Sequence, residues 1–451
     1  MFTRVRLTNF KAWRDSGDVA LKPITLLLGT NSSGKSSLVQ SLLLLKQTAQ
    51  SGGQYLRLKA NDDHEDLLDF GNFSDVLWEG SEESGRISVS LDFTLPGPQH
   101  RAGITDAAAP APSGSFTAVC GLSADGIVIL HALQLACAGR RFRVSRHQNE
   151  EYSLFVDDEA KERGRGRAYA PASSLEFSDS ALELLGRDRS FVESISTSLR
   201  SALANLDYLG PLRHVWQRGH VAATSGVSGI GADGRRAVDM LLSQHTPEGG
   251  GQGLINEVSA WISRMGLADR IEIRSGASAP AASAASAASA ASAGRHELLV
   301  HRDGVQSNIR DVGYGVSQVL PVLVLACAAA PGSTLILEEP EIHLHPLAQS
   351  VLAELFVEAS QQRGLQFLIE THSEHMFRRL QTLMARSVIG PDDVAMHFVR
   401  RSGNESVLSQ LDVDEYGAVH NWPVNFFGDS LGELRSQARA RMERQSGIDH
   451  G

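Results

Sequence analysis

Two strand patterns can be distinguished along the chain, and the first is an alternation of apolar and polar residues. It runs through residues 2–10 and 86–95, as in strands that bury only one face. Residues 119–130 and 141–156 are also strand-like. Because such alternation is typical of antiparallel sheets with one solvated face, we expect a small antiparallel sheet in the middle of the chain.

The second pattern is a run of apolar residues without alternation. Residues 24–28, 334–337 and 366–369 have this character, which is typical of strands buried on both faces of a parallel sheet. Leucines at helical spacing follow the first run in residues 36–50, and residues 347–358 form another predicted helix. Buried strands that alternate with helices predict an α/β fold.

The order of these patterns predicts one α/β domain divided by an insertion. We expect its two halves at residues 1–80 and 295–400, an inserted β-rich and helical region at residues 81–294, and a C-terminal segment at residues 401–451. Within the insertion, residues 178–206 have a helical period. Residues 277–294 are almost entirely Ala and Ser, and the lack of anchoring side chains favours a surface loop over an ordered helix.

Composition and charge narrow the class of protein. The 451 residues are 42% hydrophobic and 21% charged, which is usual for a globular protein with a core. The net charge of -10 argues against broad nucleic-acid binding, so any DNA contact requires a local basic patch. Cys120, Cys137 and Cys327 are scattered, which fits a reduced cytoplasm. Residues 1–10 lack a secretory signal pattern, and the apolar run at residues 316–330 is too short and interrupted to cross a membrane.

Residues 29–36, Gly-Thr-Asn-Ser-Ser-Gly-Lys-Ser, match the phosphate-binding pattern GxxxxGK[ST] without a mismatch. The glycines allow successive N–H groups to point at phosphate oxygens, and a helix that begins near Lys35 adds its positive end. Lys35 would neutralise the β- and γ-phosphates, and the Ser36 hydroxyl would bind Mg²⁺. A chance Gly/Ser turn is the alternative, but the buried strand before it and the helix after it are the context that the motif requires. The predicted cofactors are therefore ATP and Mg²⁺.

Two adjacent carboxylates follow the apolar run at residues 334–337. At a strand end beside the P-loop, Glu338 is expected to hold the metal and Glu339 to act as general base or to orient the attacking water. Adjacent acids at the end of a buried strand are costly unless a cation or a function balances them. A solvated strand end is the alternative for this segment alone. Glu341 is a weaker candidate, for which a position facing solvent is the alternative.

A histidine follows the next predicted strand, in the sequence Phe-Leu-Ile-Glu-Thr-His-Ser at residues 367–373. His372 could hydrogen-bond the γ-phosphate and hold the attacking water. A structural role is the alternative for a single histidine, but its order after the P-loop and the carboxylates favours catalysis. His343 and His345 could suggest a metal pair, but no third ligand is spaced nearby, and we expect a loop at a dimer face instead.

With these elements in order, the chain resembles the ABC-class ATPases of the SMC, RecF and OLD type. It is similar to compact bacterial ATPases that carry a domain of unknown function and are often encoded beside phage-defence nucleases. The further segments that carry the resemblance are residues 8–11 (Thr-Asn-Phe-Lys), 208–213 (Tyr-Leu-Gly-Pro-Leu-Arg), 311–318 (Asp-Val-Gly-Tyr-Gly-Val-Ser-Gln) and 422–428 (Trp-Pro-Val-Asn-Phe-Phe-Gly). The resemblance covers both ends of the chain and is thin over residues 85–200.

The resemblance implies an ABC-type ATPase head, a P-loop sheet flanked by helices with an antiparallel β subdomain, that dimerises around two ATP molecules. In such dimers a signature loop of one protomer caps the γ-phosphate held by the other, and here that loop is residues 311–318, before a predicted helix at residues 319–330. The usual Leu-Ser-Gly-Gly is absent, so Gly313, Gly315 and Ser317 remain alternative contacts, and a helix start without ATP contact stays open. The implied nucleotide-binding residues of the P-loop are Gly29, Asn31, Ser33, Gly34, Lys35, Ser36 and Ser37.

The Q-loop of such ATPases has no clear counterpart. Residues 69–75 are the best region but contain no glutamine, and Gln47 and Gln54 are weak alternatives. The segment after Ser373 has too few predicted strands for the nuclease domain of the OLD type. We therefore expect no nuclease in this chain.

Three functions are compatible with these features. The first is an ATPase that dimerises on ATP and regulates a partner nuclease or other effector in phage defence or DNA surveillance. The second is a DNA-repair ATPase that clamps duplex DNA, and the third is a nucleotide-gated scaffold with little turnover. Basic stretches at residues 140–143, 161–167 and 435–444 are candidate DNA contacts, but such runs are usually solvated surface.

Overall fold

The computed structural model describes residues 1–51, 55–59, 68–81, 85–95, 112–221, 229–243, 252–275 and 295–423, together with positions 436, 437, 439, 441 and 442. The Ala/Ser-rich segment predicted as a loop lies outside the described residues. So do most of the motif at residues 422–428 and half of the basic stretch at residues 435–444.

Among the described residues, six strands form a sheet in the order β11-β16-β17-β4-β18-β19. Their bounds are β4 Ile24–Gly29, β11 Leu206–Leu209, β16 Thr334–Glu338, β17 Gln366–Glu370, β18 Val394–Ser402 and β19 Glu405–Gln410. The first five are parallel to their neighbours, and β19 is antiparallel to β18. The buried strands predicted at residues 24–28, 334–337 and 366–369 are confirmed.

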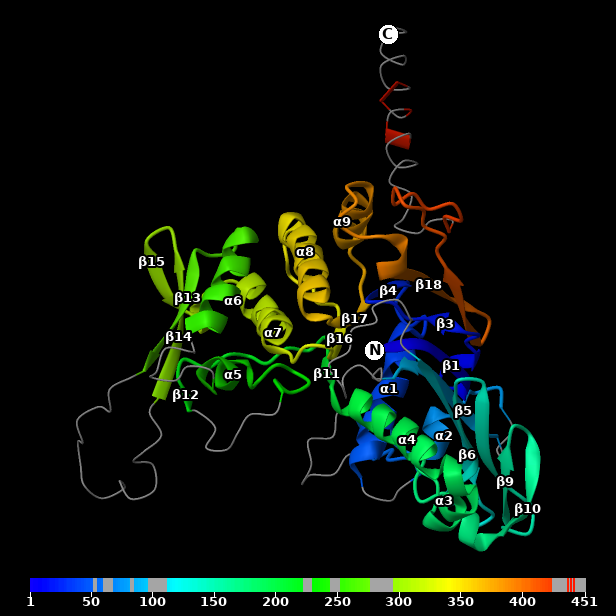
Figure 1. Cartoon of the computed structure of the whole chain (residues 1–451). Helices are drawn as coiled ribbons and strands as arrows, with labels where there is room; N and C mark the ends of the chain where they lie inside the picture. Colours follow the sequence, from blue (N-terminus) through cyan, green and yellow to red (C-terminus); the bar gives the residue numbers. More distant parts are fainter. Residues whose placement is uncertain are drawn as a thin grey trace, which may run out of the picture.

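Helices cover both faces of this sheet, because its central strands have no polar face (Figure 1). Along β4, Leu26 packs into one hydrophobic cluster and Leu27 into another. The first cluster includes the helices α6 (Gln252–Arg264), α7 (Tyr314–Ala328) and α8 (Pro346–Arg363), and the second includes α1 (Lys35–Gln50) and α4 (Arg189–Ala204). The sheet with its two helical layers is the α/β fold that the sequence predicts.

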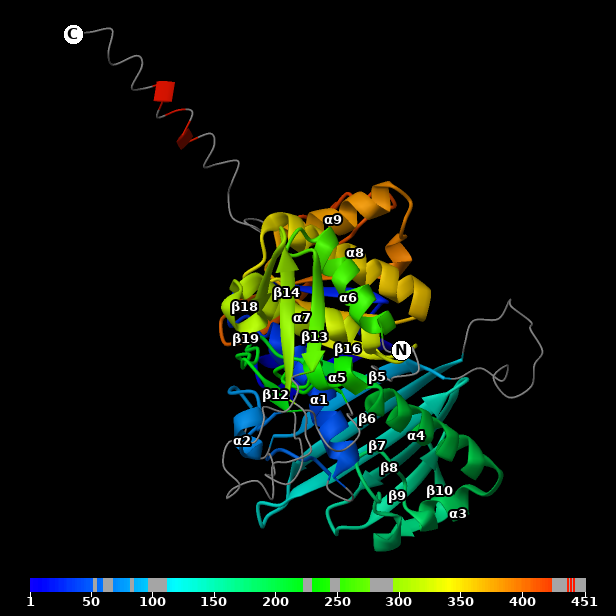
Figure 2. The same cartoon turned by 90° about the vertical axis from the view of Figure 1, so that its left-hand side faces the viewer.

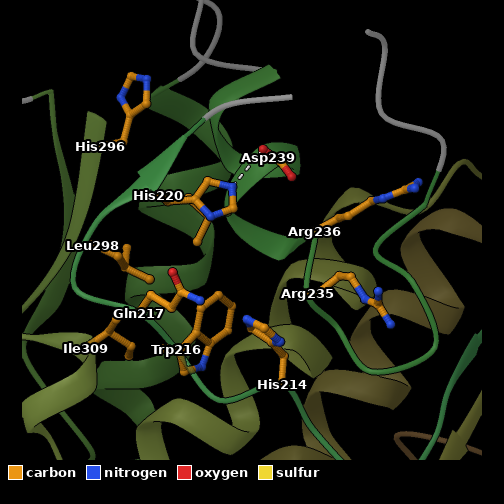
Figure 3. Close-up of a pocket in the computed structure, with 11 residues that line it drawn as sticks. His214, Trp216, Gln217, His220, Arg235, Arg236, Asp239, His296, Leu298 and Ile309 are labelled. Atoms are coloured by element: carbon orange, nitrogen blue, oxygen red, sulfur yellow. Dashed lines mark hydrogen bonds and ion pairs between the residues drawn. The ribbon is translucent and has the colours of Figure 1, made fainter. Parts of the chain in front are cut away.

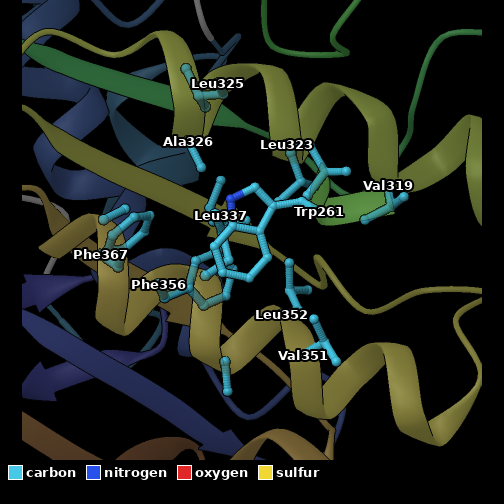
Figure 4. Close-up of a cluster of buried hydrophobic side chains, with 14 of the residues drawn as sticks. Trp261, Val319, Leu323, Leu325, Ala326, Leu337, Val351, Leu352, Phe356 and Phe367 are labelled. Carbon is cyan, nitrogen blue, oxygen red and sulfur yellow. The ribbon is translucent and has the colours of Figure 1, made fainter. Parts of the chain in front are cut away.

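In the first cluster, aromatic rings pack with aliphatic side chains between α6, α8 and β17 (Figure 4). The rings of Phe356 on α8 and Phe367 on β17 have centroids 4.8 Å apart, and Trp261 of α6 is buried beside them. Burial of large aromatic side chains contributes several kcal/mol each. This packing therefore fixes the position of the strands that carry the candidate site.

A second sheet is antiparallel and contains nine strands among the described residues, in the order β10-β9-β8-β7-β6-β5-β1-β2, with β3 paired to β1. The bounds are β1 Phe2–Phe10, β2 Trp13–Asp15, β3 Val19–Ala20, β5 Ile87–Thr94, β6 Ser113–Leu122, β7 Val128–Cys137, β8 Arg140–Arg146, β9 Tyr152–Val156 and β10 Glu159–Gly166. The alternating strands predicted at residues 2–10 and 86–95 are confirmed. The sheet is larger than predicted, because β1 from the start of the chain pairs with β5 of the insertion.

The two other strand-like regions do contain strands, and each is made of parts of two strands. Residues 119–130 are not one segment but parts of β6 and β7, joined by a turn in which Gly126 has a φ of +75°. Residues 141–156 are likewise split into β8 and β9, with Glu150 in the left-handed region at φ +64°. Both turns were hidden because short hairpin loops barely interrupt the apolar alternation.

In the described part of the chain, a smaller antiparallel sheet and four further α-helices are also present, besides short 3-10 helices at Arg167–Tyr169, Gly186–Asp188, Ile309–Asp311 and Pro391–Asp393. The strands and α-helices are β12 His220–Val221, β13 Arg270–Ser275, β14 Arg295–Arg302, β15 Val305–Asn308, α2 Phe73–Val76, α3 Asp179–Leu185, α5 Ala237–Ser243 and α9 Glu374–Ala385. Helices α3 and α4 confirm the helical period of residues 178–206. Figure 2 shows β13 and β14 beside α6, away from the nine-stranded sheet. None of the helices described is long and apolar enough to span a bilayer.

Candidate functional site

The candidate residues lie at the carboxyl ends of three adjacent strands. Strand β17 lies between β4, which leads into the P-loop, and β16, which ends in Glu338. In register, Glu370 of β17 lies beside Glu338 on one side and beside Leu27 of β4 on the other. Because the carboxyl ends of parallel strands meet at one edge of a sheet, the P-loop, the two acids and the segment after β17 come together there.

Lys35 is enclosed by the P-loop and is only 2% exposed. Its Nζ donates to the carbonyl oxygens of Thr30 at 2.9 Å and Gly29 at 3.2 Å, and it lies 3.6 Å from Glu370 Oε1. Burial lowers the pKa of Lys35, and the charge of Glu370 opposes that shift. The ammonium group is therefore held at the centre of the loop by the backbone and one carboxylate.

Two glycines give the P-loop its path. Gly29 has a φ of +141°, and a Cβ there would lie 2.0 Å from the carbonyl oxygen of Val399 in β18. Gly34 has a φ of +101°, and a Cβ there would lie 2.4 Å from Ser406 Oγ. No side chain caps the N-terminus of α1, so its first N–H groups face the loop, where an anion can accept from them.

The other predicted P-loop residues differ in how their side chains are engaged. Asn31 is exposed, whereas Ser33 is fully buried and its Oγ has no partner among the described residues. The Ser37 hydroxyl donates to the Gly34 carbonyl oxygen at 3.1 Å. Ser36 is half-buried, and no hydrogen bond within the described chain engages its hydroxyl. Of the two serines that follow Lys35, Ser36 is therefore the one with an uncommitted oxygen.

Glu338 is 6% exposed and is contacted by two residues from the segment that begins with β11. The Tyr208 hydroxyl donates to Glu338 Oε1 at 3.0 Å, and Arg213 Nη2 donates to the backbone carbonyl oxygen of Glu338 at 3.0 Å. Burial, together with the charge of Glu370, raises the pKa of Glu338 to about 7. A cation beside this carboxyl would favour its charged form, which is the environment that a metal ligand requires.

Glu339 is half-buried and has a φ of +45°, which is rare for a residue other than glycine. Its backbone N–H donates to the carbonyl oxygen of Glu370 at 2.8 Å. The carboxylate that was predicted as the base is thus carried by a left-handed residue at the strand end. Strained backbone of this kind persists only where surrounding contacts hold it.

Glu341 does not face solvent, so the alternative considered for it is wrong. It is 8% exposed, and its Oε1 accepts from the Thr371 hydroxyl at 2.6 Å and from the His372 N–H at 2.8 Å. Burial raises the pKa of Glu341. This carboxyl therefore orders the segment after β17, from which the exposed His372 ring projects. Partial desolvation and the charge of Lys35 lower the pKa of His372, which favours a neutral imidazole.

Glu370 is a candidate that the sequence pattern did not single out. It ends β17 and is 7% exposed, with Oε1 near Lys35 and Oε2 without a partner among the described residues. The signal was present, because Glu370 ends a continuously apolar run and directly precedes Thr371 and His372, as Glu338 ends its own run. The site thus holds four carboxylates close together, at positions 338, 339, 341 and 370.

Family models match three parts of the chain. An AAA ATPase domain model matches residues 1–83, which include the P-loop, and an AAA-domain model whose description names the AbiEii toxin and Type IV TA systems matches residues 263–376, which include the acids. The two matches identify an ATPase of the AAA kind. A model for a protein of unknown function, DUF3696, matches residues 389–437.

Solved structures similar to this ATPase include heads of SMC proteins. An SmcHead bound to the C-winged helix domain of ScpA is 12% identical with a TM-score of 0.47, over 92% of this chain and 98% of that one. The SMC head domain from Thermotoga maritima is 12% identical with a TM-score of 0.41, over 91% and 99%. An Smc head with an extended coiled coil, bound to the C-terminal domain of ScpA from Pyrococcus furiosus, is 11% identical with a TM-score of 0.43, over 91% and 96%. No protein of curated function matches the sequence.

The segment predicted as a signature loop, residues 311–318, lies at the start of α7, and the predicted helix start is wrong by five residues. Gly313 is the N-cap, and Gly315 and Ser317 lie within the first four helical residues. The Ser317 hydroxyl donates back to the Tyr314 carbonyl oxygen at 3.0 Å, and Ser317 is 8% exposed. In the part of the chain that the structure describes, no hydrogen bond joins these residues to the P-loop.

The glutamine alternatives for a Q-loop differ in their placement. Gln47 is buried, where its Nε2 donates to the Arg57 carbonyl oxygen at 2.8 Å and its Oε1 accepts from the Leu68 N–H at 3.2 Å. Both ends of the side chain are therefore used to hold the segment after α1. Gln54 lies outside the described residues. In the region of residues 69–75, Asp75 caps the short helix α2.

The two histidines considered as a metal pair lie near the start of α7 and of α8. The rings of His343 and Tyr314 have centroids 5.6 Å apart, and His343 itself has a φ of +62°. His345 is the N-cap of α8, and its Nδ1 accepts from the Leu347 N–H at 3.5 Å. Tyr314 and Leu347 are 72% and 58% exposed, so apolar surface surrounds these histidines.

A cavity of about 330 Å³ lies apart from the strand ends, between α5 and the smaller antiparallel sheet (Figure 3). Its lining residues are His214, Trp216, Gln217, His220, Arg235, Arg236, Val238, Asp239, His296, Leu298 and Ile309. None of the predicted site residues lines it. It adjoins the segment after β11, because Trp216 in its wall donates from Nε1 to the Ser317 carbonyl oxygen at 2.9 Å.

Proposed function

We propose that this ATPase binds Mg-ATP at its P-loop, hydrolyses it with Glu339, dimerises around two nucleotides and passes that state to a partner effector in phage defence or DNA surveillance. The observation that supports it most is the meeting of Lys35, Glu338, Glu339 and His372 at one edge of the parallel sheet. In this proposal residues 1–80 and 295–400 form the ATPase head, residues 81–294 an insertion that contributes strand β11 to the head's parallel sheet, and residues 401–451 a C-terminal appendage.

The donor atoms at the strand ends fit a nucleotide with Mg²⁺. The P-loop N–H groups and Lys35 would bind the phosphates, with Gly29, Asn31, Ser33, Gly34 and Ser37 shaping or lining the loop. Ser36 and Glu338 offer the hydroxyl and carboxylate oxygens that Mg²⁺ prefers, and no set of three or more protein ligands converges as a metal site in the described chain. The ion would therefore take its other ligands from phosphates and water.

Hydrolysis needs one group to accept the proton of the attacking water and another to stabilise the γ-phosphate. Glu339 is the best base, because its carboxylate is half-buried at the strand end and has no hydrogen bond among the described residues. His372 projects from the segment that Glu341 orders, and its neutral ring can donate one N–H to the γ-phosphate. Each residue thus takes one step of the reaction.

In the proposed dimer, the second protomer supplies a contact to the γ-phosphate in addition to those of the P-loop. Gly313, Gly315 and Ser317 lie at the N-terminus of α7, where free N–H groups can face an anion, yet none is joined to the P-loop of its own chain. Gly313 has open space around its Cα, and the neighbouring Tyr314 is 72% exposed. Such a surface is suited to the γ-phosphate of a second protomer, which would complete the site.

The deciding experiment is the Glu339→Gln substitution, assayed for ATP binding, turnover and mass. We expect ATP binding to be kept, turnover to fall by about 10²–10⁴-fold, and an ATP-dependent dimer to accumulate in light scattering. Glu415→Gln, on an exposed position in the C-terminal segment, is the matched control and should behave as wild type. Wild-type turnover in Glu339→Gln would refute the assignment of the base.

The effector role and direct DNA clamping predict different behaviour. A clamp requires ATP-dependent DNA binding that weakens steeply with salt, whereas an effector-controlling ATPase does not. The arginines at positions 140 and 141 are paired with carboxylates, Arg140 with Asp157 at 2.8 Å and Arg141 with Asp158 at 2.7 Å. This pairing argues against a DNA-binding patch at these positions. DNA binding that is lost as added salt shortens the Debye length from about 10 Å at 0.1 M to about 3 Å at 1 M would favour the clamp. Slow hydrolysis that Glu339→Gln does not change would favour a scaffold.

A further inference from the structure

The peptide group between Glu338 and Glu339 is held at both ends. Its carbonyl oxygen accepts from Arg213 Nη2 at 3.0 Å, and its N–H donates to the Glu370 carbonyl oxygen at 2.8 Å. The residue that follows this peptide group has the φ of +45° described above. A left-handed conformation costs a residue with a Cβ about 1–2 kcal/mol. The two hydrogen bonds therefore offset a local strain that would otherwise favour rotation of the peptide group.

The Arg213 side chain is buried, yet only one of its nitrogens makes a hydrogen bond within the described chain. Its side chain is 8% exposed, and its Nε and Nη1 have no partner among the described residues. Burying donors of a charged group without partners is costly, so the arrangement needs a reason other than packing. The carboxylates whose charges act on it are those of Glu338, Glu341 and Glu339. Arg213 thus supplies the positive charge on one side of the acids, as Lys35 does on the other.

The segment that carries Arg213 is anchored on both sides of it. Before it, the Tyr208 hydroxyl donates to Glu338 Oε1 at 3.0 Å, and after it, Trp216 Nε1 donates to the Ser317 carbonyl oxygen at 2.9 Å. The side chains between these anchors, Leu212 and Val215, are 86% and 79% exposed. The guanidinium is consequently placed by fixed neighbours rather than by its own flexible stem.

We propose that Arg213 is a positioning residue for ATP hydrolysis, which keeps the Glu338–Glu339 peptide group in the orientation that aims the Glu339 carboxylate at the attacking water. The inference rests on the proposed role of Glu339 as base. It assigns Arg213 no contact with the nucleotide, so Arg213 acts on the chemical step and not on ATP binding. Glu370 contributes the matching hydrogen bond through its backbone, which substitution of its side chain leaves in place.

The test is Arg213→Met, which keeps an unbranched apolar stem in place of the side chain and removes its donors. We expect kcat to fall about 10–100-fold, since a displacement of about 1 Å in a catalytic group has that effect, while KM and the Kd for a fluorescent ATP analogue stay within about threefold. Arg213→Lys keeps one donor and should recover part of kcat. Arg235→Ala removes an exposed arginine, paired with Asp233 at 2.9 Å outside the predicted signature loop, and should leave kcat unchanged.

A double variant separates positioning from a general loss of structure. If Arg213 acts through Glu339, adding Arg213→Met to Glu339→Gln should cause no further loss of turnover, because the base is already gone. An additional loss of the same size, a raised Kd for ATP or an unchanged kcat in Arg213→Met would overturn the inference. If thermal unfolding shows that Arg213→Met is not folded, the same measurements on Arg213→Lys test the inference. Wild-type turnover in Glu339→Gln refutes the proposed function instead, so the two failures can be told apart.

Discussion

The six-stranded and nine-stranded sheets are built from the same kinds of residue but bury them differently. Strands β16 and β17 are buried at every position, whereas β5 alternates buried and half-buried residues along its whole length. The parallel sheet has helices on both faces, so its polar groups collect at the strand ends. The antiparallel sheet carries polar residues along an open face, where they pair with one another. Polar groups are therefore concentrated at one edge of the six-stranded sheet and distributed over a whole face of the nine-stranded sheet.

The difference extends to polar atoms that are buried without a partner among the described residues. Ser33 Oγ, Glu341 Oε2, Glu370 Oε2 and two nitrogens of Arg213 are of this kind and lie at the carboxyl edge of the parallel sheet. Two further atoms of this kind are His397 Nδ1 on β18 and Arg379 Nε on α9. In the antiparallel sheet only Arg143 Nε is, as far as the chain is described. Unsatisfied buried groups reduce stability. Their concentration at one edge indicates where this ATPase gives up stability for function.

The largest effect expected from this comparison is that of Lys35→Ala. Its ammonium is buried between two carbonyl oxygens and Glu370, so its loss removes the charge that the phosphates require. We expect turnover to fall by at least about 10²–10³-fold and tight ATP binding to be lost in a titration with a fluorescent analogue. Lys161→Ala, on an exposed position of β10, is the control in the other sheet. ATP binding by Lys35→Ala at wild-type affinity would contradict the role of the P-loop.

The second effect concerns pH and stability. His397 of β18 is fully buried, and burial lowers its pKa to about 4 from the ordinary 6.5. Because folding lowers the pKa of His397, protonation favours the unfolded state. The contribution of His397 to the free energy of unfolding is therefore complete above pH 6.5 and is lost as the pH falls towards 4. We expect the free energy of unfolding, measured by urea titration, to drop by up to about 3 kcal/mol from this group over that window.

His397→Gln keeps a donor for the Ala20 carbonyl oxygen and cannot titrate, so it should flatten that pH dependence. His131 of the antiparallel sheet is the matched case, because burial and two arginines lower its pKa to about 4 as well. His131 is only half-buried, and solvent screening should make its effect smaller. An equal or larger effect of His131→Gln would show that burial does not separate the two sheets in this respect.

Much of the fold could be predicted because its strands follow simple patterns. The continuous runs of β4, β16 and β17 and the alternation of β1 and β5 are visible in the sequence and are confirmed. The pairing of β1 with β5 could not be predicted, since nothing local in either strand specifies a partner so distant in sequence. The turn at Gly126 was also missed, because a hairpin loop of a few residues hardly changes the alternation.

The candidate site was predictable where a motif marks it and hidden where tertiary contacts make it. Spacing alone identifies Lys35 and Ser36, and the pair at positions 338 and 339 follows from its place after a buried strand. The burial of Glu341 depends on hydrogen bonds from Thr371 and His372, which no sequence pattern shows. Arg213 appears in the sequence only as part of a resemblance, and its contact with the Glu338 backbone depends on the pairing of β11 with β16.

Two glycines with positive φ allow a third comparison, Gly29 at the end of β4 in the parallel sheet and Gly139 in a turn of the antiparallel sheet. Gly29→Ala places a Cβ 2.0 Å from the Val399 carbonyl oxygen, so the P-loop strand must move as well as adopt a strained φ. Gly139→Ala, in the turn between β7 and β8, has a φ of +78° and no atom within 4 Å of the new Cβ. We expect Gly139→Ala to lower the free energy of unfolding by about 1 kcal/mol and Gly29→Ala by about 1–3 kcal/mol more, as obtained from urea titrations. Equal losses would mean that strand β18 yields to the new methyl group.

The smallest expected effect belongs to the open face of the antiparallel sheet. Arg141 and Asp158 form an ion pair of 2.7 Å with side chains 50% and 58% exposed, so solvent and salt screen it. Arg141→Ala should change the free energy of unfolding by less than about 1 kcal/mol, and a double-mutant cycle with Asp158→Ala should give a coupling in the same range. Turnover and DNA binding should not change. A loss of DNA binding in Arg141→Ala would break the comparison, since it would give this sheet a contact with nucleic acid that its paired charges argue against.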